Sequence, residues 1–201
     1  IPIVDSSGVL THPDFVSAKA DTTNLWLEIE YKKKHADNTA KLLSKLSQRQ
    51  AFKVICRGDS FTYGQDLYSA DKRAALSDLT LDPLITAQVT NITQAGKTYP
   101  ESLQELLNIA YGANIATVVN QGISGHTIAN SLTFWTNNSQ ADGMFIMLGA
   151  NDVNTLEVDV YLQKLRTLIE QQINFGCAIF ILTPPIANSG KIESFKRALM
   201  N

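Results

Sequence analysis

Three groups of small and polar residues follow apolar segments of this 201-residue sequence, and their chemistry suits acyl transfer. Acyl transfer needs a nucleophile together with hydrogen-bond donors that face the oxygen on which negative charge develops. A serine hydroxyl can act as the nucleophile, a glycine lets a backbone N–H approach closely, and an asparagine amide donates without carrying a charge. The candidate groups are Gly58-Asp59-Ser60, Gly122 with Ser124-Gly125, and Gly149-Ala150-Asn151-Asp152.

Ser60 is the candidate nucleophile, because the apolar, β-rich run of residues 52–56 ends just before Gly58-Asp59-Ser60. Open α/β sheets carry their chemistry at the carboxyl ends of the strands. A helix that starts there would direct its unpaired N–H groups and its positive dipole end toward the hydroxyl. The alternative is a serine that only caps this helix, which is the commoner role for such a tripeptide on its own.

The elements that would position these groups alternate between strands and helices. Apolar runs predict strands at residues 52–56, 115–119, 144–148 and 178–182. Helical patterns predict helices at residues 99–111, 127–135, 157–174 and 191–200. This alternation is typical of a parallel sheet covered by helices, an α/β fold, in which the three groups would meet at one edge.

The first 50 residues differ from the rest, and we expect an N-terminal arm or connector (1–50) followed by one domain (51–201). Residues 1–10 suit a short extended piece, and residues 39–48 have helical spacing within a lysine-rich region. We expect the arm to contact a neighbouring subunit, in a homo-oligomer or a larger assembly. Residues 65–97 are polar without a clear period and predict a lid or insertion over the site.

Composition excludes several classes of protein. A hydrophobic content of 44% with 18% charged residues predicts a globular core, and a net charge of −2 gives no electrostatic attraction for nucleic acid. No apolar run approaches the roughly 20 residues that a transmembrane helix needs. Cys56 and Cys177 lie in apolar runs and predict buried free thiols. Neither belongs to a metal-ligand spacing, so we expect no metal and no cofactor.

The three groups, Gly58-Asp59-Ser60, Gly122 with Ser124-Gly125, and Gly149-Ala150-Asn151-Asp152, resemble three motif blocks of the SGNH hydrolases and occur in the same order. This family is also called the GDSL family of esterases and lipases. The resemblance covers about residues 52–200. It implies a three-layer α/β/α fold with a flavodoxin-like parallel sheet. It also implies a serine esterase that works through an acyl-enzyme intermediate, with Ser60 as the nucleophile. The Ser60 N–H, the Gly122 N–H and the Asn151 side chain would form the oxyanion hole.

One part of the family pattern is missing, because no Asp-x-x-His occurs in the sequence. That motif supplies the general base and the acid that orients it. His12 and His35 lie in the polar arm, and His126 lies near the site but not where the family places its base. We therefore expect a fragment of a longer protein, as the non-Met first residue also suggests. An intact mass near 22.1 kDa for the natural product would contradict this expectation.

Two functions remain open at this point. The first is an esterase for O-acetyl groups on a polysaccharide, since the polar segment 65–97, with Tyr63, Tyr68 and Tyr99 nearby, suits a carbohydrate. The arm is similar to connectors in phage tail-fibre and tailspike proteins that carry such esterases, which would imply an extracellular or virion-associated location. The second is a catalytically inactive SGNH-like module that binds glycans or has a structural role. The missing base motivates this alternative.

Overall fold

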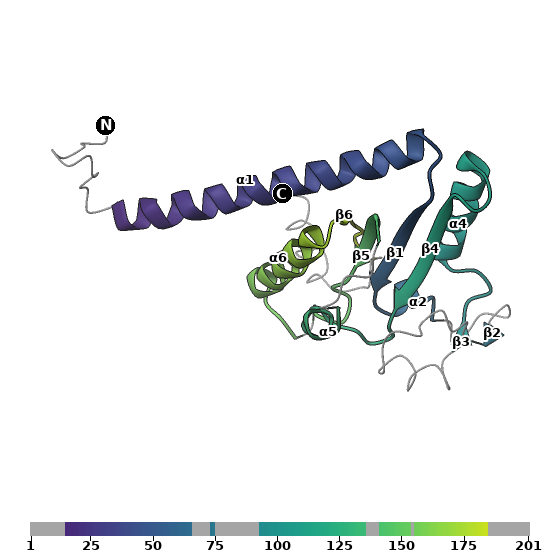
Figure 1. Ribbon diagram of the computed structural model, residues 1–201. Helices are drawn as coiled ribbons and strands as arrows, with labels where there is room; N and C mark the ends of the chain where they lie inside the picture. Colours follow the sequence, from purple (N-terminus) through teal and green to yellow (C-terminus); the bar gives the residue numbers. More distant parts are fainter. Residues whose placement is uncertain (1–14, 66–72, 75–92, 136–140, 154, 185–201) are drawn as a thin grey trace.

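A parallel sheet forms the centre of the protein, as the alternation of strands and helices predicts (Figure 1). The computed structural model describes residues 15–65, 73–74, 93–135, 141–153 and 155–184. The four strands run in the order β4-β1-β5-β6 and all pair in parallel. Their bounds are β1 (Phe52–Gly58), β4 (Ala116–Gly122), β5 (Gly143–Met147) and β6 (Ala178–Ile181). The helices between them are α4 (Tyr99–Tyr111), α5 (Ile128–Phe134) and α6 (Val158–Asn174).

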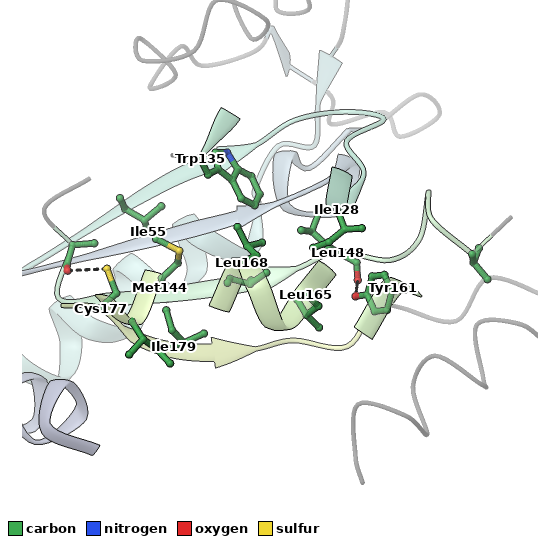
Figure 2. Packing of buried hydrophobic residues seen from close by; sticks show 14 residues of the cluster. Ile55, Ile128, Trp135, Met144, Leu148, Tyr161, Leu165, Leu168, Cys177 and Ile179 are labelled. Atoms are coloured by element: carbon green, nitrogen blue, oxygen red, sulfur yellow. Dashed lines mark hydrogen bonds between the residues drawn. The ribbon is translucent and has the colours of Figure 1, made fainter. Parts of the chain in front are cut away.

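Both faces of the sheet are covered, which makes it the middle of three layers. Successive strand residues point to opposite faces. On one face, Ile55 belongs to a buried cluster that includes side chains of α5 and α6, such as Ile128 and Leu168 (Figure 2). On the other face, Val54 lies in a second cluster with Leu42 of the N-terminal helix and side chains of α4. Burial on both faces explains why the strands read as continuous apolar runs.

The register of the strands brings the carboxyl ends of three of them together. Gly58, the last residue of β1, pairs with Gly122 of β4 on one side and with Met147 of β5 on the other. A Cβ atom at position 58 would lie 2.0 Å from Thr62 Oγ1 and 2.5 Å from the Met147 carbonyl oxygen. Only glycine therefore fits where β1 turns into the next helix.

Helix α1 (Phe15–Ser47) is much longer than the helical segment 39–48 that the sequence indicates. Its C-terminal part packs on the domain, where Asn38 Nδ2 donates to the carbonyl oxygens of Ile173 at 3.0 Å and Cys177 at 3.1 Å. The Ile179 N–H of β6 donates to His35 Nε2 at 3.0 Å. Figure 1 shows the N-terminal part of α1 extending beyond the sheet. The region predicted as a connector thus includes a helix that covers the β6 edge.

Part of the predicted lid is a short antiparallel pair, β2 (Arg73–Ala74) with β3 (Thr93–Gln94). The rest of that segment, the extended piece at residues 1–10 and the helix predicted at residues 191–200 lie outside the described residues. Cys56 and Cys177 are buried and free, as predicted. Within the described ranges, no helix is long and apolar enough to cross a membrane, and no three potential ligands gather as a metal site would require.

Candidate active site

Ser60 is the first residue of the one-turn helix α2 (Ser60–Tyr63), directly after β1. Asp59 is the N-cap, because its Oδ1 accepts a hydrogen bond from the Phe61 N–H at 3.0 Å. The helix ends at Gly64, whose φ of 80° suits glycine, and the Gly64 N–H donates to the Ser60 carbonyl at 2.9 Å. The cap is thus Asp59 and not Ser60, which leaves the half-buried Ser60 hydroxyl without the capping role.

Gly122 lies beside α2, as the resemblance implies, but its N–H is already engaged. It donates to Asn120 Oδ1 at 3.0 Å. The residue is buried, and a Cβ atom there would lie only 2.1 Å from Tyr63 N. Before the Gly122 N–H could bind an oxyanion, the Asn120 side chain would have to release it. The role of Gly122 as an oxyanion donor stays a prediction.

Gly125 is a further glycine of the same loop that the sequence analysis did not single out as a donor. It is exposed, its φ is 75°, and no atom lies within 4 Å of a Cβ at this position. The surroundings of Gly125 are therefore open to a bound group, whereas those of Gly122 are filled. The sequence does contain Gly125 in its second candidate group, as Ser124-Gly125, so this glycine could have been considered as a donor.

Asn151 follows β5 and is tied to the loop that precedes α5. Its Nδ2 donates to the His126 carbonyl oxygen at 2.8 Å. An amide nitrogen carries two hydrogens, so this bond uses only one of them. The Ile128 N–H, the first of α5, donates to the neighbouring Asp152 at 3.0 Å for Oδ1 and 3.2 Å for Oδ2. The structure therefore joins the third group of the sequence to the loop that carries the second.

Asp59 and Asp152 are both fully buried, and each accepts a hydrogen bond from a loop or helix-start N–H group. Burial raises the pKa of Asp59 to about 6; the hydrogen bond from the Phe61 N–H opposes this shift, and the charge of Asp152 adds to it. Burial likewise raises the pKa of Asp152 to about 6, against the hydrogen bond from Ile128. Two buried acids with raised pKa values thus adjoin Ser60 and Asn151 in the sequence.

Neither described histidine is placed like a general base. The His126 ring is 3% exposed and meets the Trp135 ring edge-on, with 5.2 Å between centroids. A ring that is almost fully buried has little access to the substrate hydroxyl or to Ser60 from solvent. His35 lies on α1 and bonds the β6 backbone. His12 lies outside the described residues. The interpretation of His126 as the base is therefore not supported by its surroundings.

Comparison with known proteins shows which fold this is. No protein-family model and no curated protein matches the sequence. An acetylxylan esterase from Geobacillus stearothermophilus superposes with a TM-score of 0.52 and 20% identity, over 74% of this chain and 68% of that one. A GDSL-like lipase from Parabacteroides merdae gives a TM-score of 0.55 and 19% identity, over 75% of this chain and 72% of that one. The protein therefore has the fold of the SGNH hydrolases, as its motifs indicate.

Proposed function

We propose that the protein is a serine esterase of the SGNH type, with Ser60 as its nucleophile. The observation that carries the proposal is the meeting of the three motif groups at one sheet edge. Gly58, two residues before Ser60, pairs with Gly122 and with Met147. The Asn151 amide reaches back to the loop that follows Gly122. A nucleophile, a glycine loop and an uncharged side-chain donor are the parts that acyl transfer needs.

In this mechanism, Ser60 Oγ attacks the ester carbonyl carbon, and the electron pair of the C=O bond moves onto oxygen. The Ser60 N–H, at the start of α2, and Asn151 Nδ2 would stabilise that oxygen. The third donor would come from the glycine loop: Gly122 once Asn120 releases it, or Gly125. Collapse of the intermediate expels the alcohol, which takes the proton that Ser60 lost. Water then hydrolyses the acyl-enzyme by the same steps.

The proton needs an acceptor, since a serine hydroxyl alone is a weak nucleophile at neutral pH. The Asp-x-x-His of the family pattern has no counterpart among the 201 residues. Neither described histidine is assigned this proton, because His126 packs against Trp135 and His35 is bonded to the β6 backbone.

We propose acetyl esters of a polysaccharide as the substrate class. A protein of the same fold is named as an acetylxylan esterase. Of the tyrosines that motivated this idea, Tyr63 is 3% exposed and the Tyr99 hydroxyl lies 3.3 Å from Thr62 Oγ1. Tyr63 therefore offers little surface to a sugar, the Tyr99 hydroxyl already has a partner, and Tyr68 lies outside the described residues. Phe61, beside Ser60, is 43% exposed and is the only aromatic among the large exposed apolar side chains of the described residues. Its ring is the better candidate for contact with a carbohydrate.

The test is the hydrolysis of p-nitrophenyl acetate and of acetylated xylo-oligosaccharides by the full-length protein and its Ser60→Ala variant. Loss of the nucleophile should lower kcat by about 1000-fold or more. Ser47→Ala, an exposed position on α1, is the matched control and should retain the full rate. Equal rates in the wild type and Ser60→Ala would remove the esterase proposal.

A second candidate function is a glycan-binding or structural module without catalysis, for example in a phage tail fibre. The engaged Gly122 N–H and the packed histidine rings favour it. Calorimetric titration with the same acetylated oligosaccharides separates the two functions. Binding without hydrolysis, equal in the wild type and Ser60→Ala, would favour this module. Sedimentation of the protein with and without residues 1–30 would show whether the arm drives assembly.

A further inference from the structure

The His126 ring is buried although the residue belongs to a loop. It lies edge-on to the Trp135 ring, with 5.2 Å between centroids and 90° between planes, and 5.9 Å from the Phe134 ring. Both partners lie at the C-terminal end of α5, whereas His126 precedes its N-terminus. The ring therefore anchors the start of the loop–helix unit to its end.

The backbone of His126 makes two hydrogen bonds within and beyond this loop. Its N–H donates to the Ile123 carbonyl at 3.1 Å, which closes a turn. Its carbonyl oxygen accepts the hydrogen bond from Asn151 Nδ2 at 2.8 Å. A single residue thus connects the buried aromatic cluster to the amide that the proposed mechanism uses as an oxyanion donor.

Trp135, against which the ring packs, is itself fixed by three other elements. The Arg57 guanidinium carbon lies 5.0 Å from the Trp135 ring centroid. Arg57 is 2% exposed and donates to Gln121 Oε1 at 3.0 Å and to Gln172 Oε1 at 3.2 Å. Gln172 in turn donates to the Trp135 carbonyl at 2.9 Å. Side chains of β1, β4 and α6 therefore hold the surface on which the imidazole rests.

We propose that His126 is a positioning residue for Asn151. Its buried ring fixes the backbone carbonyl, and this carbonyl directs the second amide hydrogen of Asn151 toward the oxygen of a bound ester. The inference rests on the proposed role of Asn151. Orientation matters because a donor stabilises a transition state only where the charge develops, and a displacement of about 1 Å can cost about 100-fold in rate.

This role and that of a general base need different parts of the same side chain. Positioning depends on a flat ring of this size, whereas a base needs a ring nitrogen. His126→Phe keeps the ring and removes the nitrogens, and His126→Ala removes both. His126→Leu, which fills most of the volume without an aromatic edge, serves if the alanine variant does not fold. Thr133→Ala, on the exposed face of α5, is the control.

The first readout is independent of catalysis. In the ¹⁵N-labelled full chain, Asn151→Asp identifies the side-chain amide signals of Asn151 by their loss. The wild type, Thr133→Ala and His126→Phe should show matching amide shifts with slow hydrogen exchange. In His126→Ala or His126→Leu, the signals should move toward those of a solvent-exposed amide, with exchange faster by about tenfold or more, since an unbonded amide exchanges without first opening. Unchanged amide signals in these variants would overturn the proposal.

The second readout is p-nitrophenyl acetate hydrolysis. We expect His126→Ala to lower kcat by about 10- to 100-fold with little change in KM, and His126→Phe to restore kcat to within a few-fold of the wild type. A His126→Phe rate as low as that of Ser60→Ala would overturn positioning in favour of a base. If the wild type itself is no faster than Ser60→Ala, the esterase proposal fails, and the amide signals alone decide the role of His126.

Discussion

The Ile128 N–H donates to both carboxylate oxygens of Asp152, at 3.0 Å and 3.2 Å, so a buried acid from the loop after β5 holds the first turn of α5. The hydrogen bond favours the ionised acid and burial favours the neutral one. Burial prevails, since the pKa of Asp152 rises from 3.8 to about 6. Asp152 directly follows Asn151 in the chain, so its charge lies next to a residue of the proposed site.

Asp152 should make the stability of the protein depend on pH. Its pKa is higher in the folded than in the unfolded chain, so the folded protein binds the proton of Asp152 more tightly than the unfolded chain does. The resulting stabilisation is complete below about pH 4 and is lost as the pH rises through about 6. Relative to Asp152→Asn, the wild type should therefore lose free energy of unfolding between pH 4 and pH 7. Urea unfolding of both proteins checks this, and a constant difference across that range would contradict it.

The positions of the strands and most helices could be predicted because burial on both faces leaves a simple pattern. The strand predicted at residues 52–56 is β1, Phe52–Gly58, and it runs further because Arg57 and Gly58 stay in register with β4. The length of α1 was missed, since only Asn38 and Leu42 are buried among residues 30–47, the part of the helix whose side chains are described. Lys32 and Lys33 are exposed, whereas His35 and Asn38 bond the domain and Leu42 packs on it. These positions have helical spacing, but two of the three side chains are polar, so they leave no apolar period in the sequence.

Gly122 and Gly125 should respond very differently to alanine. At Gly122 the new Cβ would lie 2.1 Å from Tyr63 N and 2.5 Å from the Thr62 carbonyl carbon, so α2 would have to move. We expect Gly122→Ala to cost about 3 kcal/mol of unfolding free energy. At Gly125 the space is open, and only the φ of 75° opposes a side chain, which costs about 1 kcal/mol. Denaturant unfolding of both variants measures the difference, and equal losses would contradict the packing described for Gly122.

The meeting of the three motif groups could be predicted from the sequence, but their hydrogen bonds could not. Parallel strands place their carboxyl ends at one edge, which brings Ser60 and Asn151 to the same side of the sheet. The Asn151 bond, in contrast, depends on the His126 carbonyl, and this depends on a ring packed against Trp135. Side-chain packing between a loop and the far end of a helix leaves no periodic pattern in the sequence.

The hydrogen bond between the Gly122 N–H and the Asn120 side chain should contribute measurably to the free energy of unfolding. Asn120 Oδ1 accepts from the Gly122 N–H, which is otherwise buried beside α2. Asn120→Ala leaves that N–H unpaired and should cost about 1–3 kcal/mol. Ser47→Ala, at an exposed position on α1, is the control and should cost little. Thermal and denaturant unfolding compare the two, and equal stability of Asn120→Ala and the control would show that the bond to Gly122 contributes little.

The contact between His35 and Ile179 should protect the edge strand β6. The Ile179 N–H donates to His35 Nε2 at 3.0 Å, so α1 satisfies a backbone group that a neighbouring strand does not pair within the described sheet. His35→Ala should cost about 1–3 kcal/mol and should speed hydrogen exchange at the Ile179 amide. Lys33→Ala, exposed on the same helix, is the control and should change neither quantity. Undiminished protection of the Ile179 amide in His35→Ala would mean that α1 lies beside β6 without stabilising its edge.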